Sequence, residues 1–133
     1  MTGRRSVAGI LLRDGKVFTA RRDRIGALGG LWEFPGGKVE EGETDRQALE
    51  REFMEEFGAR VAAGALVGED SFAHRGSPRA LSAYLVELEP GASLVPREHV
   101  ELRWSRIDEL ERLDLVDSDR KLLPFIKILQ GLK

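Results

Sequence analysis

Three glutamates in one short segment, Glu52, Glu55 and Glu56, have the spacing of neighbours on a helix. Residues three and four apart project from the same side of a helix, so these carboxylates lie close enough to share one cation and repel one another without it. Surface helices usually pair such acids with bases four residues away. Here only Arg51 stands nearby, where it neutralises Glu55 in part. The spacing therefore indicates a divalent-cation site.

The stretch around these acids is unusual in charge and in backbone freedom. Residues 37–59 hold eight acidic and three basic side chains, so the rest of a chain of net charge −2 carries about three positive charges. A solvated acidic face would explain the helix alone. Pro35, Gly36 and Gly37 precede it, however, and glycines let the backbone approach a ligand closely, while Glu43 can orient this loop or the arginine. Carboxylate and carbonyl oxygens suit Mg²⁺ bound to phosphates, which predicts metal-assisted phosphate chemistry.

Local signals fix the limits of the helix that carries the acids. Thr44 followed by Gln47 is a capping-box pattern, and Gly58 is a typical C-terminal stop, so the spacing predicts a helix over Asp45–Phe57. An apolar stripe on a second side of this helix predicts the face that packs on the core: Leu49, Phe53 and Phe57.

The remaining pattern alternates short strands with helices and predicts an α/β sandwich with a mixed sheet. A turn at Asp14-Gly15 joins the first two strands, and a glycine-containing loop spans residues 24–31. The last residues, from Ser118 to Leu132, have helical spacing. Strands are expected at residues 7–12, 16–22, 32–34, 60–67, 81–88 and 100–104.

Composition limits the possible classes of protein. With 133 residues and 41% apolar side chains, we expect one domain over residues 1–133. The apolar run near the start is about six residues long, too short for a signal segment or membrane span, so we expect a cytoplasmic protein without a membrane partner. The absence of cysteine excludes disulfides and thiolate catalysis. The slight positive charge outside residues 37–59 does not predict nucleic-acid binding, and His74 and His99 are expected as surface or packing residues.

The acidic segment resembles the signature of the Nudix hydrolases. Gly37, then Glu43 after five residues, then the run Arg51–Ala59 after seven more match the Nudix box at every charged and glycine position. Phe53 and Ala59 stand where the family usually has aliphatic residues, which affects packing and leaves the chemistry intact. Residues 30–38, GLWEFPGGK, are similar to the MutT-like branch, which acts on nucleoside triphosphates. The resemblance covers nearly the whole chain and implies the Nudix fold, an α/β/α sandwich around a mixed sheet.

The resemblance also implies a reaction and roles for residues of this chain. MutT-like enzymes hydrolyse a nucleoside triphosphate to the monophosphate and pyrophosphate with Mg²⁺, for which Mn²⁺ can substitute. Arg51 matches the arginine that orients the catalytic glutamates, Glu43 its ion-pair partner, and Lys38 a lysine that positions phosphates. Either Glu52 or Glu98, which stands six residues before Trp104, is the general base, and Glu98 is alternatively a further metal ligand. The implied metal ligands are Gly37 through its carbonyl, Glu52, Glu55, Glu56 and Glu98.

Substrate choice rests by resemblance on residues outside the box. Phe34 lines the base pocket, Arg22 reaches the nucleotide, and Asp119 reads the base edge where the MutT enzyme that removes oxidised guanine nucleotides has an asparagine. A carboxylate only accepts hydrogen bonds unless protonated, so the exchange leaves two candidates open: oxidised guanine nucleotides such as 8-oxo-dGTP first, and cytosine or 5-methylcytosine nucleotides second. Phe34 is alternatively plain core, Arg22 a solvated strand residue, and Asp119 part of a helix cap.

Two further function classes remain. The box also serves enzymes that cleave dinucleotides, nucleotide sugars or ADP-ribose, which the short chain makes the weaker choice. A non-catalytic module that senses nucleotides or contacts RNA is the third class, and it would tolerate loss of the glutamates, none of which is missing here. The partner that we expect is a small-molecule nucleoside triphosphate, bound by a monomer and not by a dimer.

Overall fold

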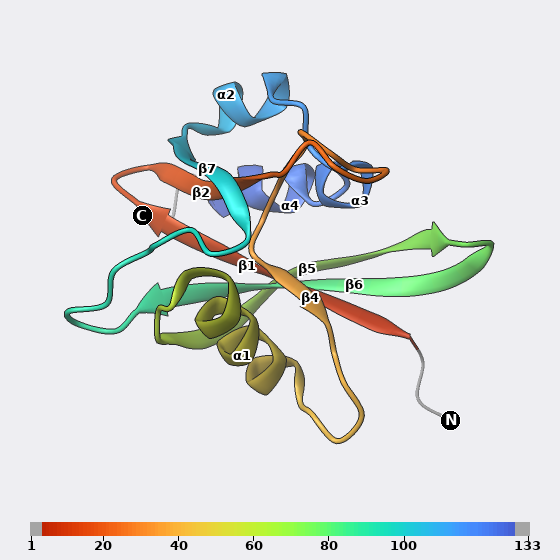
Figure 1. The fold of residues 1–133 in the computed structure, drawn as a ribbon, viewed down its shortest axis with the longest axis horizontal. Coiled ribbons are helices and arrows are strands. Elements are labelled where there is room, and N and C mark those ends of the chain that lie inside the picture. The colour runs from red at the N-terminus through yellow and green to blue at the C-terminus, as the bar shows by residue number, and fades with distance from the viewer. Residues whose placement is uncertain (1–3, 130–133) are drawn as a thin grey trace.

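Residues 4–129 are described by a computed structural model, in which strands and helices alternate as the sequence predicts. The chain starts with a β-hairpin and then enters two very short strands before the first helix (Figure 1). A long hairpin, one more strand and three short helices follow. In chain order the elements are β1 (Arg5–Arg13), β2 (Lys16–Arg22), β3 (Trp32–Glu33), β4 (Gly36–Lys38), α1 (Asp45–Phe57), β5 (Val61–His74), β6 (Ser77–Leu88), β7 (His99–Ser105), α2 (Ile107–Arg112), α3 (Asp117–Arg120) and α4 (Leu123–Ile128).

The strands form one mixed sheet of the order β3-β2-β1-β6-β5. The central strand β1 runs parallel to β6 and antiparallel to β4, with Val7 opposite both Gly37 and Ser82. β2 pairs with β3 and β7 at the other end of β1. β4 therefore lies beside the middle of the fold, held by the same strand that carries the long β5–β6 hairpin.

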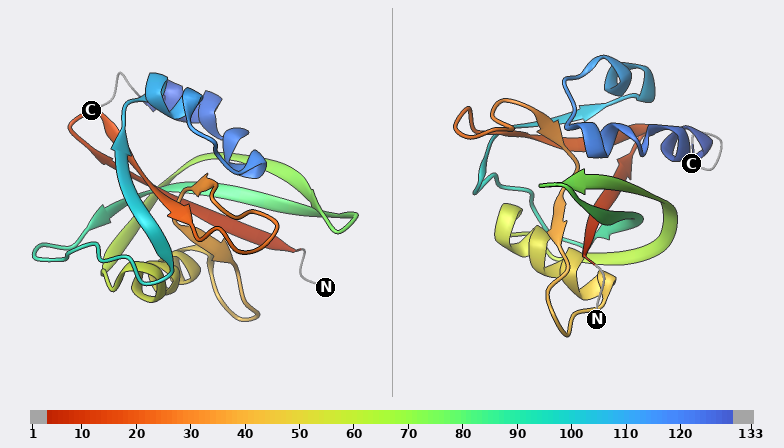
Figure 2. Two further views of the ribbon diagram at one scale, coloured as in Figure 1. Left: turned by 45° about the horizontal axis from the view of Figure 1, so that its top comes forward. Right: turned by 90° about the vertical axis from the view of Figure 1, so that its right-hand side faces the viewer.

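Helices cover both faces of the sheet (Figure 2). α1 contacts β1, β4 and β5 on one face, whereas α4 contacts β5 on the other. Gly68 of β5 leaves the room that the Phe125 ring of α4 occupies, since an added Cβ would collide with that ring. The arrangement is the mixed-sheet α/β fold that the sequence predicts.

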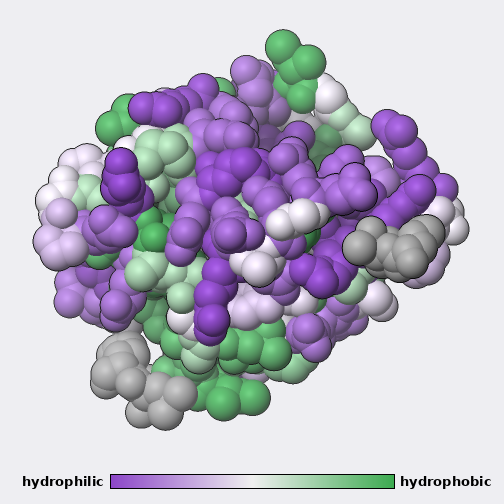
Figure 3. Space-filling view, turned by 90° about the horizontal axis from the view of Figure 1, so that it is seen from below, coloured by the Kyte–Doolittle hydropathy of each residue, from purple (hydrophilic) through white to green (hydrophobic). Residues whose placement is uncertain are grey.

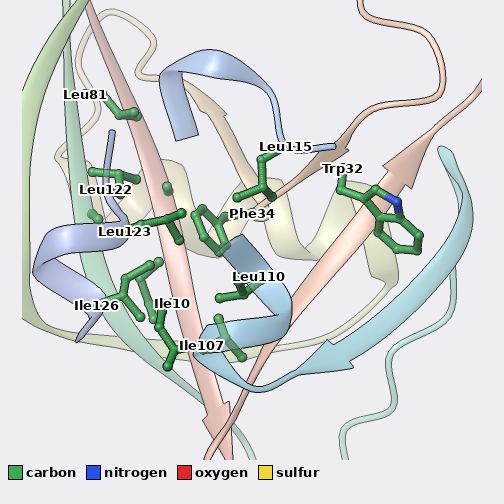
Figure 4. Close-up of a cluster of buried hydrophobic side chains, with 13 residues drawn as sticks. Ile10, Trp32, Phe34, Leu81, Ile107, Leu110, Leu115, Leu122, Leu123 and Ile126 are labelled. Carbon is green, nitrogen blue, oxygen red and sulfur yellow. The ribbon is translucent and has the colours of Figure 1, made fainter. Parts of the chain in front are cut away.

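Alternation along β1 divides the buried side chains into two clusters. Val7 and Leu11 pack towards α1 with Leu49, Phe53 and Phe57, all three of which are fully buried. Ala8 and Ile10 point the other way, into the cluster that Figure 4 shows around Phe34, Leu110, Leu122 and Leu123. The predicted packing stripe of α1 is therefore confirmed, because successive strand residues face opposite sides of a sheet.

Three sequence predictions need correction. The segment expected as a glycine loop forms β4, because the backbone of residues 36–38 pairs with β1. The helix expected from Ser118 to Leu132 is two helices, α3 and α4, because Pro124 lacks an N–H and starts a new first turn; residues 130–132 lie outside the described part. β5 continues to His74, well beyond the predicted end at Val67. α2 had no counterpart in the prediction.

The face of the molecule seen from below the view of Figure 1 is mostly hydrophilic, with a smaller hydrophobic area towards one edge (Figure 3). α1 lies on this side in Figure 1. Within residues 4–129, every helix is too short or too polar to cross a membrane.

Candidate active site

The acidic helix α1 is held at both ends by the groups that the sequence indicates. Thr44 accepts a hydrogen bond from the backbone N–H of Gln47, and the Gln47 side chain accepts one from the backbone of Thr44. Gly58 adopts the left-handed conformation at the C-terminus, with φ of 64°. Asp45 is bound by Arg5 of β1 and by the Tyr84 hydroxyl of β6, at 2.5 Å. These contacts fix the helix against the sheet, and with it the glutamates of its other side.

Arg51 is the centre of the ionic contacts on α1. Its Nε donates to Glu43 at 2.6 Å, and its Nη1 donates to Glu52 at 3.1 Å and to Glu55 at 3.3 Å. Its Nη2 donates to the backbone carbonyl of Lys38 at 3.0 Å. The side chain of Glu43 in turn accepts from the N–H of Glu40, and the Arg51 guanidinium keeps the pKa of Glu43 below its usual value. Arg51 therefore links β4, the loop after it and two of the glutamates.

Glu56 is the most buried of the three glutamates. Its residue is 5% exposed, and its Oε1 has no hydrogen-bond partner. Burial raises the pKa of Glu56 well above its usual range, and the nearby carboxylates of Glu52, Glu33 and Glu98 add to that rise. A buried carboxylate among other acids is stabilised either by a proton or by a cation. Within residues 4–129 no three such side chains converge as a ready ligand set, since Arg51 holds Glu52 and Glu55, but the donor groups suit a divalent cation.

β4 brings backbone directly against the acidic helix α1. A Cβ atom added to Gly37 would lie 2.5 Å from the Oε2 atom of Glu52, so no side chain fits at this position. Gly37 is opposite Val7 of the α1-side cluster, whereas Lys38 is opposite Ser6 and faces the other side of the sheet. The glycine is therefore required by the close approach of strand and carboxylate.

Glu98 is exposed and lies on the loop before β7. The preceding residue, Arg97, donates its backbone N–H to the carbonyl of Glu56 at 2.9 Å and its Nη1 to the carbonyl of Met54 at 3.1 Å. The negative charge of Glu98 is among the causes of the raised pKa of Glu56. The structure therefore brings Glu98 to the end of α1, and Arg97, which sequence reasoning missed, makes the connection. Its position next to Glu98 was the available signal.

Arg22 lies in an ionic network that the sequence did not predict. Its Nη1 is 3.3 Å from Glu33, whose other oxygen is 2.7 Å from Nε2 of His99. The ring of His99 stacks on Phe57 of α1, with centroids 5.5 Å apart, and its side chain is 4% exposed. His99 is thus a packing residue, as expected. Glu33 therefore lies close to both Arg22 and Glu56. Its place between Trp32 and Phe34 was the only signal for it in the sequence.

Phe34 and Asp119 meet across the sequence. The backbone N–H of Phe34 donates to Oδ2 of Asp119 at 2.9 Å, and both residues are buried. The segment before α3 reaches β3 through hydrogen bonds of Trp32 with Asp114 and Val116. Burial raises the pKa of Asp119 to about 7, while the Phe34 N–H counteracts and the charge of Glu33 adds to the rise. Phe34 and Trp32 both belong to the α4-side cluster, so Phe34 has a packing role whatever else it contacts.

Comparison with known proteins identifies what this arrangement is. The architecture is a mixed sheet between helices, with an acidic helix after a glycine strand. The NUDIX domain profile matches residues 3–126, and the chain belongs to the Nudix family. It is a Nudix hydrolase, and members of this family use divalent metal ions.

Individual relatives agree with this assignment. The chain is 44% identical over 119 residues to the "Putative 8-oxo-dGTP diphosphatase 2" of Mycobacterium tuberculosis, which covers 86% of this chain and 81% of that protein. It is 39% identical over 117 residues to the "CTP pyrophosphohydrolase" of Escherichia coli K12, covering 88% and 86%. The solution structure of the E. coli ORF135 protein has a TM-score of 0.85 at 36% identity and covers 100% of this chain and 94% of that one.

Proposed function

We propose that this enzyme hydrolyses a nucleoside triphosphate to the monophosphate and pyrophosphate with Mg²⁺, or Mn²⁺ in its place. One observation carries the proposal: the buried Glu56, with an unpartnered oxygen, lies beside Glu52, whose carboxylate lies against Gly37 of β4. Such a donor set suits a hard divalent cation with phosphate oxygens as its other ligands. Glu52, Glu55 and Glu56, with the Gly37 carbonyl and Glu98, are the proposed ligands.

When bound, the metal neutralises the polyphosphate and lowers the pKa of a bound water. The protein residues do the rest. Glu52 or Glu98 takes a proton from the water that attacks phosphorus, and the bond to the departing pyrophosphate breaks. Arg51 holds Glu52 in place and ties it to the Lys38 carbonyl, which keeps helix and strand in one geometry. Glu43 in turn fixes the guanidinium of Arg51, and Lys38 positions the phosphates.

Oxidised guanine triphosphates are our first candidate substrates. Asp119 is buried next to the backbone of Phe34, and its raised pKa of about 7 lets it carry a proton near neutral pH. A protonated carboxyl donates to a base carbonyl and still accepts from Phe34, as an asparagine would. Phe34 would contact the base, and Arg22 would reach the nucleotide from the adjacent strand.

Cytosine or 5-methylcytosine triphosphates are the second candidates. The ionised form of Asp119 accepts from the exocyclic amino group of cytosine, and the E. coli relative at 39% identity is named a CTP pyrophosphohydrolase. The two protonation states of one carboxyl therefore favour different bases. We also expect the enzyme to act as a cytoplasmic monomer on small-molecule nucleotides.

The test is a substrate panel measured at pH 6 and pH 8.5 with Mg²⁺. It contains normal and oxidised nucleoside triphosphates, methylated cytosine nucleotides, ADP-ribose and dinucleotides, with the monophosphate and pyrophosphate quantified. We expect triphosphates to be cleaved, and the kcat/KM ratio of 8-oxo-dGTP to CTP to fall as pH rises through 7. The Asp119→Asn variant is the matched control, since its side chain does not titrate. Cleavage of ADP-ribose alone, or no turnover with tight nucleotide binding, would replace this proposal with one of the other two classes.

A further inference from the structure

Arg79 of β6 is a buried cation without an acidic partner. The residue is 8% exposed, and its Nε has no hydrogen-bond partner. None of the ion pairs formed within residues 4–129 includes it. Asp70, two pairs further along the β5–β6 ladder, is exposed and accepts from the N–H of Ser71. An unpaired buried charge is costly, so this position points to a ligand.

The register of the sheet places Arg79 on the face that carries α4. Arg79, Leu81 and Ala83 are two residues apart on β6, so their side chains point to the same face of the sheet. Leu81 and Ala83 belong to the cluster around Phe34, and Phe72, which pairs with Arg79, packs against that cluster. Leu81 is opposite Ser6 on β1, and Ser6 is opposite Lys38 on β4. Arg79 and Lys38 therefore project from the same face of the sheet, in neighbouring rows.

Other cations share this part of the fold. The pKa of His74 is lowered by desolvation and then by the positive charges of Arg79, Arg75, Lys38 and Arg4, so each of these groups lies within electrostatic reach of His74. The backbone carbonyl of Arg4 accepts from Ala80, the residue after Arg79, at 3.0 Å. In Figure 1, β1 begins on the side of the molecule where the chain turns from β5 into β6. None of the ion pairs formed among residues 4–129 contains one of these basic side chains either.

We propose that Arg79, with Lys38 and Arg4, forms an anion subsite that holds a phosphate group next to the metal-binding strand. Several cations gathered without acids repel one another, and a phosphate supplies charge and acceptor oxygens that suit a guanidinium fork. Lys38 continues the subsite to Gly37, whose backbone faces Glu52. The phosphate is either the tail of the triphosphate or free pyrophosphate, and this inference rests on the proposed function for its ligand.

Calorimetric titration of the full-length protein with pyrophosphate in Mg²⁺ tests the subsite without turnover. Arg79→Met should weaken pyrophosphate binding about tenfold or more and leave nucleoside monophosphate binding unchanged. Arg79→Lys should restore part of the affinity. Arg60→Met is the matched control, because Arg60 is exposed and precedes β5 at the opposite end from Phe72. Thermal unfolding of each variant in phosphate-free buffer establishes that it is folded.

The KM of the best triphosphate substrate separates the two sources of phosphate. A parallel rise of KM in Arg79→Met assigns the subsite to the substrate tail, and an unchanged KM with weaker pyrophosphate binding assigns it to free pyrophosphate. Unchanged pyrophosphate affinity in Arg79→Met overturns the proposal, as does a selective loss of monophosphate binding, which would make Arg79 a nucleoside contact. Pyrophosphate binding through Arg79 in a protein that cleaves no triphosphate would refute the proposed function and leave the subsite standing.

Discussion

The acidic helix α1 and the proposed nucleotide pocket are built in opposite ways. The ionic contacts of the α1 glutamates are local, because Arg51 reaches four groups no more than 13 residues away. The pocket instead depends on contacts such as Phe34 with Asp119, 85 residues apart, and Glu33 with His99, 66 residues apart. The first region is a local device, and the second exists only once the whole sheet has formed.

This contrast has a functional meaning. A mostly local arrangement keeps its geometry as long as α1 and the pairing of β4 with β1 are in place, which suits the step of bond cleavage common to a family. A pocket assembled from distant segments changes when any one of them changes, which suits substrate choice. Substitutions in the first region should therefore reduce turnover of every substrate alike, whereas those in the second should reorder substrates.

The largest effect is expected for Glu52→Gln. Loss of a carboxylate that binds metal or removes the proton from water should lower kcat about a thousandfold for all triphosphates, at the scale of lost general-base catalysis. The far-ultraviolet circular dichroism should stay as in the parent. Glu50→Gln, an exposed neighbour on α1, is the control and should keep full activity. Pyrophosphate release near the parent rate in Glu52→Gln would refute the role of the box in this chain.

Gly37→Ala should have the second largest effect. The new methyl group would meet the Glu52 carboxylate, so strand or carboxylate must shift by an amount that costs about tenfold to hundredfold in kcat. Gly64→Ala is the matched control, since its Cβ would be 3.5 Å from the nearest atom. Equal kcat values in the two variants would mean that the close approach of β4 to α1 has no catalytic importance.

Asp119→Asn tests the pocket through its pH dependence. Burial raises the pKa of Asp119 from 3.8 to about 7, so the folded protein keeps a proton that the unfolded chain loses in this range. Stability from this group is therefore present at low pH and lost as pH rises towards 7, and the asparagine lacks this loss. When the pH is raised from 5 to 7.5, the unfolding free energy of Asp119→Asn should therefore rise by about 2 to 3 kcal/mol relative to that of the parent.

Urea unfolding at both pH values measures this gain, with the same two proteins compared in each buffer. A constant difference between parent and variant would show that Asp119 ionises as freely as it does in an unfolded chain. Glu33, whose charge also raises the pKa of Asp119, remains in both proteins and so cancels in the comparison.

The smallest effect is expected for Tyr84→Phe. Its hydroxyl donates to Asp45 at 2.5 Å, and Arg5 holds the same carboxylate, so the loss should cost only about 1 kcal/mol of unfolding free energy. kcat should change less than twofold, because the glutamates are fixed by Arg51. A large drop in kcat would mean that the attachment of α1 to β6 also sets the catalytic geometry.

The same contrast explains what the sequence could and could not predict. The limits of α1 were predicted correctly because Thr44, Gln47 and Gly58 act on neighbouring backbone groups. β4 was missed because its pairing with Ser6 and Val7 is non-local, and glycines alone indicate a loop. The break between α3 and α4 could be predicted from Pro124, because proline lacks the N–H that a continuous helix needs. The partners of Arg22 and Asp119, and the isolation of Arg79, depend on which strands lie side by side, and spacing along the chain carries no such information.

The three residues of β4 also set a limit on how this protein can change in length. Because neighbouring strand residues point to opposite sides, Gly37 meets Glu52 while Lys38 projects to the face of the sheet that carries α4. One inserted or deleted residue within 36–38 would exchange the two sides and place a charged side chain against the Glu52 carboxylate. The loop that follows is held as well, because Val39 donates its N–H to the Arg5 carbonyl and Glu43 donates its N–H to the Glu40 carbonyl. The segment from β4 to Glu43 is therefore expected to keep its length, whereas side chains on its exposed side can vary.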